Sequence, residues 1–464
     1  MTSRSLRASA LLVALAATTT ACLLAPASAA AASTTIEAAA TALGFGPNRV
    51  TELAGSGDIT SSLATAAKSE GSATQAHVIH LSGNSVTVNT IVRPANFVYI
   101  VAERGTRVTW RGANTNLLRF ESAGPVIGGV YGGIWDGAGR GSTNLIHLGN
   151  ADVRLAELTV SHAGQNGIAA YRNSSLTLSN VTATDNDSAG VYVADASALT
   201  AFGLRSTNNR GNGAQVSSRS TGTITDSVLD RNGGHGLGVA AANVTVTSTS
   251  TSRNKVCGVS LFGGAHATIS GGHLDNNGRH GLGTVPGTTA TVSDSTVASN
   301  GYNGVLASGR GTHVTLQRVV ITSTDRSGLS VPSGGSATIE GSTITGPRTG
   351  SNKYNISVSG KGRLSLRSSN TISGSRSHGI TVSKRSRIEI SGAGNVISSN
   401  RGDGLRLTGS GTTGRISASV TFRGNRRSAI AVVSRAKLEM VTTCIYSGNT
   451  GRVETRSRGK VTNI

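Results

Sequence analysis

Four side chains that can exchange protons or carry a positive charge occupy related positions in this sequence: His235, Lys255, His280 and Tyr302. Each lies between the asparagine and the glycine of an Asn-x-x-x-Gly motif. A β-elimination on a uronic acid needs a cation to neutralise the carboxylate, a base to take the C5 proton and an acid for the leaving oxygen. Lysine or arginine can supply the cation, histidine the base and tyrosine the acid. We therefore predict these four residues as a catalytic set.

Further polar residues of the same motifs, and of the strand that follows each motif, are predicted to bind the substrate. Arginines among them could neutralise a carboxylate in place of Lys255, and His235 and His280 are alternative bases. Exposed turns collect polar residues whatever their function, so a row of solvated turns is the competing interpretation. The predicted substrate-binding set is Asp187, Tyr192, Arg210, Gln215, Arg279 and Arg326.

One glycine recurs with a short apolar strand after it, and an asparagine usually stands four residues before it. The spacings between successive glycines are 23, 23, 23, 22, 23, 23 and 24 residues. Stacked, inward-facing asparagines can satisfy the backbone groups of the turn, while glycine permits either a positive φ or a close backbone approach. The glycines are Gly167, Gly190, Gly213, Gly236, Gly258, Gly281, Gly304 and Gly328.

Each period contains three short strands. The strand after the glycine alternates apolar and polar residues, as in residues 190–193, and second and third strands follow, as in residues 244–246 and 343–344. Side chains alternate between the two faces of a strand. Three strands and three turns per coil predict a prism with three long parallel sheets, in which successive turns stack about 5 Å apart. The predicted catalytic residues then form one line along the solenoid.

The N-terminal part is predicted to contain an export signal and a capping helix. Residues 1–32 are interpreted as a secretory signal peptide, with Arg4 and Arg7 before the apolar stretch 8–25. A lipid anchor at Cys22 is disfavoured because apolar residues continue beyond it. Residues 33–71 are predicted to include a helix over about 59–68, capped by Asp58, that covers the open end of the core. Residues 72–464 are predicted to be a single β-helix.

The net charge of +21 is unevenly distributed over the 464 residues. From residue 341 onward there are 21 Lys+Arg against 4 Asp+Glu, whereas the first 340 residues have 22 against 18. This predicts an acidic polysaccharide or an anionic cell-wall polymer as partner, with solubility of an exposed solenoid end as the alternative. Aromatic residues make up only 3%, which disfavours a nucleic-acid partner that needs base stacking. No segment after the signal is apolar enough to span a membrane, and the oligomeric state stays open.

Two features constrain cross-links and cofactors. Cys257 and Cys444 lie about eight coils apart, far beyond disulfide reach. Asp185 and Asp187 flank Asn186, but Ca²⁺ needs six to eight oxygens, so Ca²⁺ is left open and no other cofactor or metal is predicted. Asp230 and Arg253 are expected to form a salt bridge between adjacent coils.

The Asn-x-x-x-Gly repeats, the helix before the strands and the segment GGVYGGIWDGAG at 128–139 resemble the pectate-lyase-like superfamily of right-handed parallel β-helices. The resemblance covers about residues 55 to 450. It implies an all-β solenoid with three parallel sheets and a short N-terminal capping helix. It also implies that substrate lies along the first strand of each coil and the turn leading into it.

The resemblance leaves the activity open between three functions. We predict a secreted protein that acts on a uronate-containing polysaccharide by β-elimination. The alternative is a non-catalytic cell-surface or glycan-binding protein. A polygalacturonase-like hydrolase is the second alternative, since Gly234-His235-Gly236 resembles a motif of that family. The segment one coil earlier, 211–213, lacks the aspartate pair that accompanies the motif.

Overall fold

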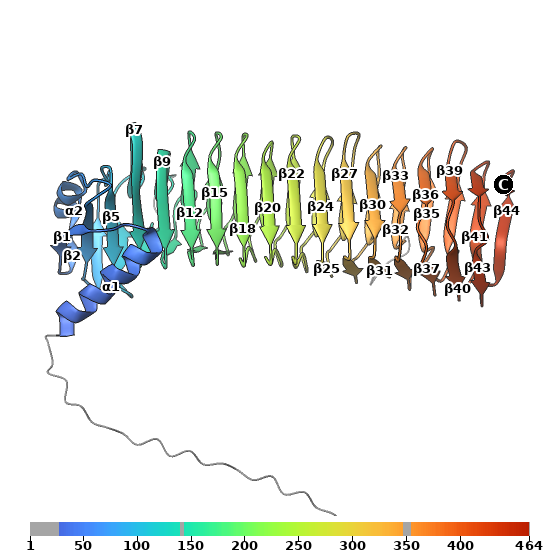
Figure 1. Cartoon of the computed structure of the whole chain (residues 1–464), viewed down its shortest axis with the longest axis horizontal. Helices are drawn as coiled ribbons and strands as arrows, with labels where there is room; N and C mark the ends of the chain where they lie inside the picture. The colour runs from blue at the N-terminus through green and yellow to red at the C-terminus, as the bar shows by residue number, and fades with distance from the viewer. Residues whose placement is uncertain (1–26, 140–142, 347–353, 464) are drawn as a thin grey trace, which may run out of the picture.

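The computed structural model describes residues 27–139, 143–346 and 354–463, which form one elongated solenoid of stacked coils (Figure 1). The N-terminal helices lie at one end and the C-terminus at the other. All paired strands are parallel, and each coil contributes strands to up to three sheets. The predicted parallel β-helix with three parallel sheets is confirmed.

The first sheet contains the strands that follow the recurring glycine. Two long strands, β7 (Leu118–Tyr131) and β9 (Ile146–Ala156), begin in this sheet and continue around the corner into the second sheet. The remaining strands are β11 (Ile168–Tyr171), β14 (Val191–Val193), β17 (Ala214–Ser217), β19 (Leu237–Ala240), β21 (Val259–Phe262), β23 (Leu282–Thr284), β26 (Val305–Ala307), β29 (Leu329–Val331), β32 (Ile356–Val358), β35 (Ile380–Ser383), β38 (Leu405–Thr408), β41 (Ser428–Val433) and β44 (Gly451–Arg456).

The second sheet begins near the N-terminus and runs the length of the solenoid. Its strands are β1 (Asn48–Leu53), β3 (Ala76–Leu81), β5 (Val98–Ala102), the ends of β7 and β9, β12 (Ser175–Ser179), β15 (Ala198–Phe202), β18 (Thr221–Thr225), β20 (Asn243–Thr247), β22 (His266–Ser270), β24 (Thr289–Ser293), β27 (His313–Gln317), β30 (Ser336–Glu340), β33 (Arg363–Leu366), β36 (Arg387–Ile390), β39 (Thr413–Ile416), β42 (Lys437–Met440) and β45 (Lys460–Asn463).

The third sheet is divided into two seven-stranded parts. One part contains β2 (Gly57–Asp58), β4 (Ser85–Val88), β6 (Arg107–Trp110), β8 (Ile134–Asp136), β10 (Thr159–Ser161), β13 (Thr182–Thr184) and β16 (Arg205–Thr207). The other contains β25 (Thr296–Ala298), β28 (Val320–Thr322), β31 (Thr343–Thr345), β34 (Thr371–Ser373), β37 (Asn395–Ser398), β40 (Val420–Arg423) and β43 (Ile445–Ser447). Isolated bridges through Val228, Ser250 and His273 connect the two parts.

The core is a column of inward side chains flanked by a ladder of buried asparagines. In β14, Val191 and Val193 are fully buried while Tyr192 faces outward, as the alternation predicted. Each ladder asparagine accepts hydrogen bonds from the preceding coil, the one nearer the N-terminus. The side-chain and backbone nitrogens of Asn209, for example, donate to Asn232 Oδ1 at 3.1 and 3.0 Å. This confirms the predicted role of the asparagines. The central ladder is Asn186, Asn209, Asn232, Asn254, Asn277 and Asn300.

The recurring glycine is required by close packing, and its φ is not positive. A Cβ added at Gly258 would lie 2.7 Å from the carbonyl oxygen of Thr251 and 2.8 Å from that of Gly281. A methyl group at that distance would force the adjacent coils apart. Of the two explanations offered for this glycine, close backbone approach is therefore the correct one.

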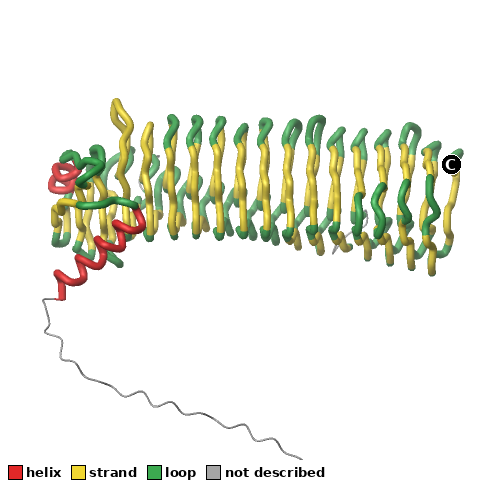
Figure 2. Tube along the Cα trace, in the orientation of Figure 1, coloured by secondary structure: helices red, strands yellow, loops and turns green. Residues whose placement is uncertain are grey.

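The two helices of the described chain, α1 and α2, lie at the N-terminal end (Figure 2). Helix α2 (Thr60–Ala67) buries Leu63 and Ala67 against the end of the core, as predicted. Its N-cap residue is Ile59, while the Asp58 carboxylate accepts a hydrogen bond from the backbone N–H of Thr60 at 2.9 Å. Helix α1 (Ala27–Leu43) was not predicted. It crosses the boundary predicted at residue 32.

Helix α1 covers the outer face of the second sheet near β5, β7 and β9. Leu43 and the following Phe45 pack there in a small second core, with the Phe45 and Tyr99 rings 4.6 Å apart. The signal-peptide features at Arg4, Arg7 and Cys22 lie outside the described residues. In the described part of the chain, no helix is long and apolar enough to cross a membrane. Cys257 and Cys444 are both free thiols.

Candidate functional site

The Asn-x-x-x-Gly turns stack directly on one another. Lys255 N–H donates to the carbonyl of Asn232 at 2.9 Å, and Gly278 N–H donates to the carbonyl of Asn254 at 2.8 Å, so each turn is bonded to the one before it. We call the three x positions of these turns, together with the outward side chains of the first sheet, the corner face. Residues about one period apart in sequence are neighbours on this face.

The centre of the corner face holds a stack of two arginines and a tyrosine. Arg279, Tyr302 and Arg326 occupy the second x position of three successive coils. The Arg326 guanidinium carbon lies 3.9 Å from the centre of the Tyr302 ring, and that of Arg279 lies 5.8 Å from it. Both arginines are exposed, and neither forms an ion pair with another described residue. His280 meets the Tyr302 ring edge-on, with the ring centres 5.8 Å apart.

The histidines of the corner face serve as hydrogen-bond acceptors between coils. His280 Nδ1 accepts the backbone N–H of Asn303 at 3.3 Å, and His235 Nδ1 accepts that of Cys257 at the same distance. Asn303 has the same role one coil further on, where its Oδ1 accepts the N–H of Ser327 at 3.1 Å. The third x position therefore forms a second ladder in which histidine and asparagine are interchangeable.

This ladder determines the protonation of the two histidines. A backbone N–H can only donate, so Nδ1 must carry its lone pair and the neutral ring holds its proton on Nε2. Burial, reinforced by the positive charge of Arg279, lowers the pKa of both His235 and His280 to about 4. Both rings are thus neutral near pH 7, with an Nε2–H available to donate a hydrogen bond.

The structure separates the predicted site residues into two groups. His280, Tyr302, Arg279 and Arg326 come together in the central stack. The other group lies several coils nearer the N-terminus and contains Asp187, Tyr192, Arg210 and Gln215.

Each member of that second group has a partner of its own. Arg210 pairs with Asp187 at 3.2 Å, and Gln215 Oε1 accepts a hydrogen bond from Asn212 at 2.7 Å. Tyr192 packs beside Tyr171. Among the described residues, no member of this group forms an ion pair, side-chain hydrogen bond or ring contact with a member of the central stack.

Two predicted residues lie between the groups. The Lys255 side chain is exposed and forms no hydrogen bond or ion pair with the rest of the described chain. The His235 ring packs against Phe262, with ring centres 5.8 Å apart. The catalytic and binding roles of all ten residues stay predictions.

Four histidine–aromatic pairs occur along the corner face, and the prediction missed most of their members. Aromatic residues make up only 3% of the chain, so the occurrence of these pairs on one face distinguishes that face from the rest of the surface. Aligning the outward-facing positions of successive coils in the sequence, one period apart, could have revealed that these rings are neighbours. The pairs are His147–Tyr171 at 5.3 Å, His235–Phe262 at 5.8 Å, His280–Tyr302 at 5.8 Å and Tyr354–His378 at 5.9 Å between ring centres.

A charged cluster near β7 lies beside the first of these pairs. The Glu121 carboxylate forms ion pairs with Arg119 and Arg172, and His147 Nε2 lies 3.8 Å away. Burial alone would raise the pKa of Glu121, but these neighbours outweigh it and hold the pKa below its ordinary value. Gly149 leaves the necessary space, since a Cβ there would lie 2.9 Å from the carboxyl carbon.

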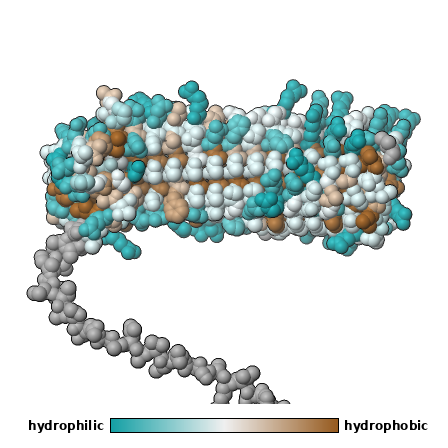
Figure 3. Space-filling model, in the orientation of Figure 1, coloured by the Kyte–Doolittle hydropathy of each residue, from teal (hydrophilic) through white to brown (hydrophobic). Residues whose placement is uncertain are grey.

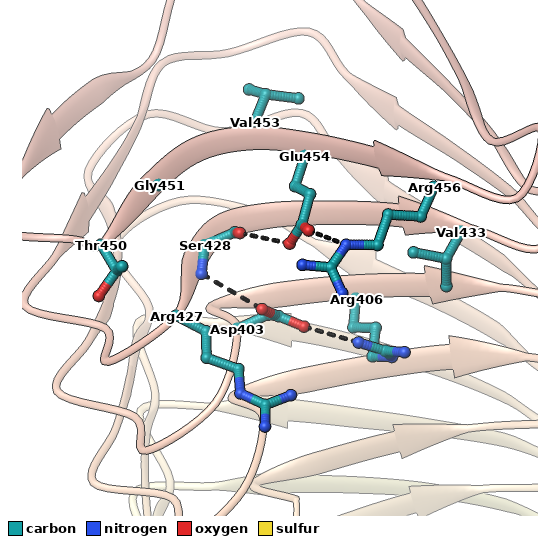
Figure 4. Close-up of a pocket in the computed structure, with 10 residues that line it drawn as sticks. All are labelled: Asp403, Arg406, Arg427, Ser428, Val433, Thr450, Gly451, Val453, Glu454 and Arg456. Atoms are coloured by element: carbon teal, nitrogen blue, oxygen red, sulfur yellow. Dashed lines mark hydrogen bonds and ion pairs between the residues drawn. The ribbon is translucent and has the colours of Figure 1, made fainter.

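A pocket of about 600 Å³ opens on the corner face near the C-terminus (Figure 4). Ser428 bridges its two carboxylates. Its N–H donates to Asp403 at 3.2 Å and its hydroxyl donates to Glu454 at 2.8 Å. Arg406 pairs with Asp403 at 2.9 Å, and Arg456 pairs with Glu454. The prediction did not include this pocket.

The carboxylates of this pocket are already neutralised by arginine. Burial tends to raise the pKa of Asp403, but hydrogen bonds and charge from His378 and Arg406 outweigh it and lower the pKa. Asp403 therefore stays ionised and cannot act as the general acid that a glycoside hydrolase needs.

The arrangement of the described acidic and histidine side chains bears on the Ca²⁺ prediction. Within the described ranges, no group of three or more His, Cys, Asp or Glu side chains converges. At the turn considered for Ca²⁺, Asp187 is engaged by Arg210 and Asp185 accepts the Thr184 hydroxyl at 2.7 Å. The expected salt bridge between Arg253 and Asp230 is confirmed at 2.9 Å, although Asp230 is buried.

Comparison with known proteins identifies the fold family. A family model described as the right-handed β-helix region matches residues 138–272, 166–320 and 303–463, which together exceed half of the chain. No curated protein matches the chain.

Among solved structures, the A-module of mannuronan C-5 epimerase AlgE4 from Azotobacter vinelandii is 13% identical. That match covers 90% of this chain and 97% of that one, with a TM-score of 0.42. Pectate lyase Pel9A is 15% identical over 61% and 77% of the two chains, also at 0.42. PfbA, a surface adhesin of Streptococcus pneumoniae, is 10% identical over 79% and 85%, at 0.36. These matches concern the fold alone, and the chain belongs to the right-handed β-helix family.

Proposed function

We propose that this protein binds a linear acidic polysaccharide along the corner face. The observation that carries the proposal is the Arg279–Tyr302–Arg326 stack, in which two exposed guanidinium groups without described ion-pair partners flank an aromatic ring. A guanidinium matches a carboxylate with two parallel hydrogen bonds. An aromatic ring offers an apolar surface on which a sugar ring can lie.

The spacing of the corner face suits a polymer better than a single sugar. Coils repeat about every 4.8 Å along the axis, so cations and rings recur at a short, regular interval. The histidine–aromatic pairs extend the aromatic surface from His147 to His378. A chain of sugars lying parallel to the axis could contact several of these pairs together. The predicted export signal would bring the protein to such polymers outside the cell.

β-Elimination is the second candidate function, and the setting of Tyr302 favours it. Arg279 and Arg326 would neutralise the uronate carboxylate, and His280 Nε2–H would donate a hydrogen bond to it. The Tyr302 hydroxyl would relay the proton. Its oxygen would take the C5 proton as the C4–O bond breaks and the C4–C5 double bond forms, while its own proton passes to the leaving oxygen. This differs from the scheme predicted from the sequence, in which His280 or His235 is the base and Tyr302 is the acid.

Binding is tested by titrating the full chain with a panel of uronans and neutral glucans of equal length. The variant Arg279→Gln/Arg326→Gln should weaken uronan binding by about a hundredfold, since a charge-assisted hydrogen bond contributes about 1.5–3 kcal/mol. Arg205→Gln is the matched control, because Arg205 is also exposed but lies on the third sheet. Equal affinity for uronans and glucans, or no effect of the double variant, would reject the proposal.

Turnover is tested on the same panel by ultraviolet absorbance of unsaturated uronate ends. Tyr302→Phe should keep binding and abolish any rise in absorbance, whereas His280→Asn should reduce the rise. If the unmodified protein binds uronans but causes no rise in absorbance, the protein binds the polysaccharide without catalysing its cleavage. New reducing ends without absorbance would indicate hydrolysis and contradict the elimination.

A further inference from the structure

A strip of basic side chains runs along one edge of the second sheet in the C-terminal coils. It comprises the turn before β33, β36, β42 and β45 and the first residue of each of these strands. Strand β39, between β36 and β42, has Gly411 and Thr413 at these positions, so the strip consists of two pairs of charged coils. All members are exposed, and among the described residues only Arg387 of this set forms an ion pair, with Glu389 at 3.9 Å. The basic strip consists of Lys361, Arg363, Lys384, Arg385, Arg387, Arg435, Lys437, Arg458 and Lys460.

Like charges stand directly opposite one another in this strip. Arg363 pairs in register with Arg387, and Lys437 pairs in register with Lys460. Like charges at directly opposed positions of adjacent strands are destabilising. The adjacent outward column of β36, β39 and β42 alternates in sign through Glu389, Arg415 and Glu439, and Arg415 pairs with Glu439 at 3.1 Å. Charge is therefore compensated in one column and uncompensated in the column beside it.

The earlier coils show that the fold does not need these charges. The turn position occupied by Lys361, Arg385, Arg435 and Arg458 is glycine in four preceding coils. Those glycines have φ values of +79°, +80°, +78° and +82°, and the basic residues keep the left-handed conformation at +70°, +62°, +66° and +64°. A side chain in this region costs about 1–2 kcal/mol relative to glycine. The four glycines are Gly264, Gly287, Gly311 and Gly334.

The first residue of each strand of the second sheet shows the same change from uncharged to basic residues. In earlier coils this position is occupied by small or polar residues and two histidines, namely Ser175, Ala198, Thr221, Asn243, His266, Thr289, His313 and Ser336. In later coils it is occupied by Arg363, Arg387, Lys437 and Lys460, with Thr413 between Arg387 and Lys437. Figure 3 shows this change on the visible face, where pale rows over the middle coils give way to hydrophilic side chains near the C-terminal end. Two separate costs, strain and repulsion, thus coincide on one surface.

We propose that the basic strip is a docking site for inorganic polyphosphate, a linear chain of directly linked phosphates, and that it is distinct from the glycan-binding corner face. A bound polyanion would remove the repulsion between coils and release counterions. Each coil of the strip offers cations in two columns, on the turn and on the strand. A phosphate chain supplies charges at that density, whereas a uronan carries one carboxylate per sugar ring. A hollow of about 310 Å³ lined by Arg363, Arg387 and Ser336 lies on the same surface.

The test is titration of the full chain with long-chain inorganic polyphosphate at several salt concentrations. Arg363→Gln/Arg387→Gln/Lys437→Gln/Lys460→Gln should weaken binding at least tenfold and make the salt dependence shallower. Lys361→Gly/Arg385→Gly/Arg435→Gly/Arg458→Gly should weaken binding similarly while raising the melting temperature, because it removes both strain and repulsion. If the fourfold glutamine variant fails to fold, Arg363→Gln/Arg387→Gln alone gives the same comparison.

The control separates this proposal from the proposed function. Arg279→Gln/Arg326→Gln should leave polyphosphate binding unchanged, and the strip variants should leave uronan binding unchanged. Polyphosphate affinity that survives both sets of strip variants would overturn the proposal. The proposal would also be overturned if the strip variants weakened uronan binding, or if a DNA duplex displaced polyphosphate at equal phosphate concentration.

Discussion

The inner asparagine ladder and the corner face arise from the same five-residue motif, yet they behave in opposite ways. The asparagine is nearly invariant from coil to coil, since each one satisfies the turn of its neighbour. The three residues that follow it vary widely, because the backbone of the turn is held by bonds that no side chain supplies. This difference indicates that side chains with a function on this solenoid are confined to positions whose side chains the fold does not need for its own hydrogen bonds. The third x position is intermediate, because its side chain also joins coils.

The largest effect should come from breaking the inner ladder. In Asn254→Ala, the backbone N–H of Asn232 loses its acceptor and the buried turn loses the donor to the carbonyl of Leu229. Each unsatisfied buried group costs about 1–3 kcal/mol, so the variant should lose several kcal/mol of stability in urea denaturation. Asn243→Ala, at an exposed strand position, is the control and should change little. Equal stability of the two variants would contradict the structural role of the ladder.

The next effect compares two kinds of glycine. Gly258→Ala places a methyl group within 3 Å of two backbone oxygens, which should cost about 1–3 kcal/mol through overpacking. Gly264→Ala meets no atom within 4 Å and carries only the penalty of its positive φ, about 1–2 kcal/mol. Gly258→Ala should therefore have the lower melting temperature. The reverse order would mean that the coils can move apart easily.

Stability should also depend on pH through the second ladder. The pKa values of His235 and His280 are lowered from 6.5 to about 4 in the folded protein, so the unfolded chain binds protons more readily. The stabilisation is present above pH 6.5 and is lost as the pH falls from 6.5 to about 4. Urea midpoints over this range should fall in the unmodified protein and fall less in His235→Asn/His280→Asn. Parallel curves would contradict the buried, neutral state of the rings.

The smallest effect on stability is expected at His280, where two substitutions distinguish a structural role of the ring from a role in binding the ligand. Asparagine fills the same position in the next coil and accepts the same kind of bond, so His280→Asn should be nearly as stable as the original. His280→Ala leaves the N–H of Asn303 without its acceptor and should cost about 1 kcal/mol. If His280→Asn keeps full uronan binding, the ring is chiefly structural. Loss of binding in both variants with stability intact in His280→Asn would assign the ring to the ligand.

The sequence was sufficient for features that repeat and insufficient for those that occur once. The asparagine ladder, the three sheets and the stacked corners all follow from a constant period. Helix α2 is the exception, a single feature predicted from Asp58 and from the need to cover the open end of the core. The corner-turning strands β7 and β9 break that period, so the contact of Glu121 with Arg172 could not be predicted. The positive φ of Arg385 is likewise invisible in the sequence, because lysine and arginine do not mark left-handed turns as glycine does.

The most direct test of the central claim is a crystal structure of the protein with a bound oligouronate. We expect the sugar chain to lie along the stacked corners, parallel to the solenoid axis, with a carboxylate within hydrogen-bond distance of Arg279 or Arg326. A ligand bound instead on the second or third sheet, with both guanidinium groups still free, would contradict the account.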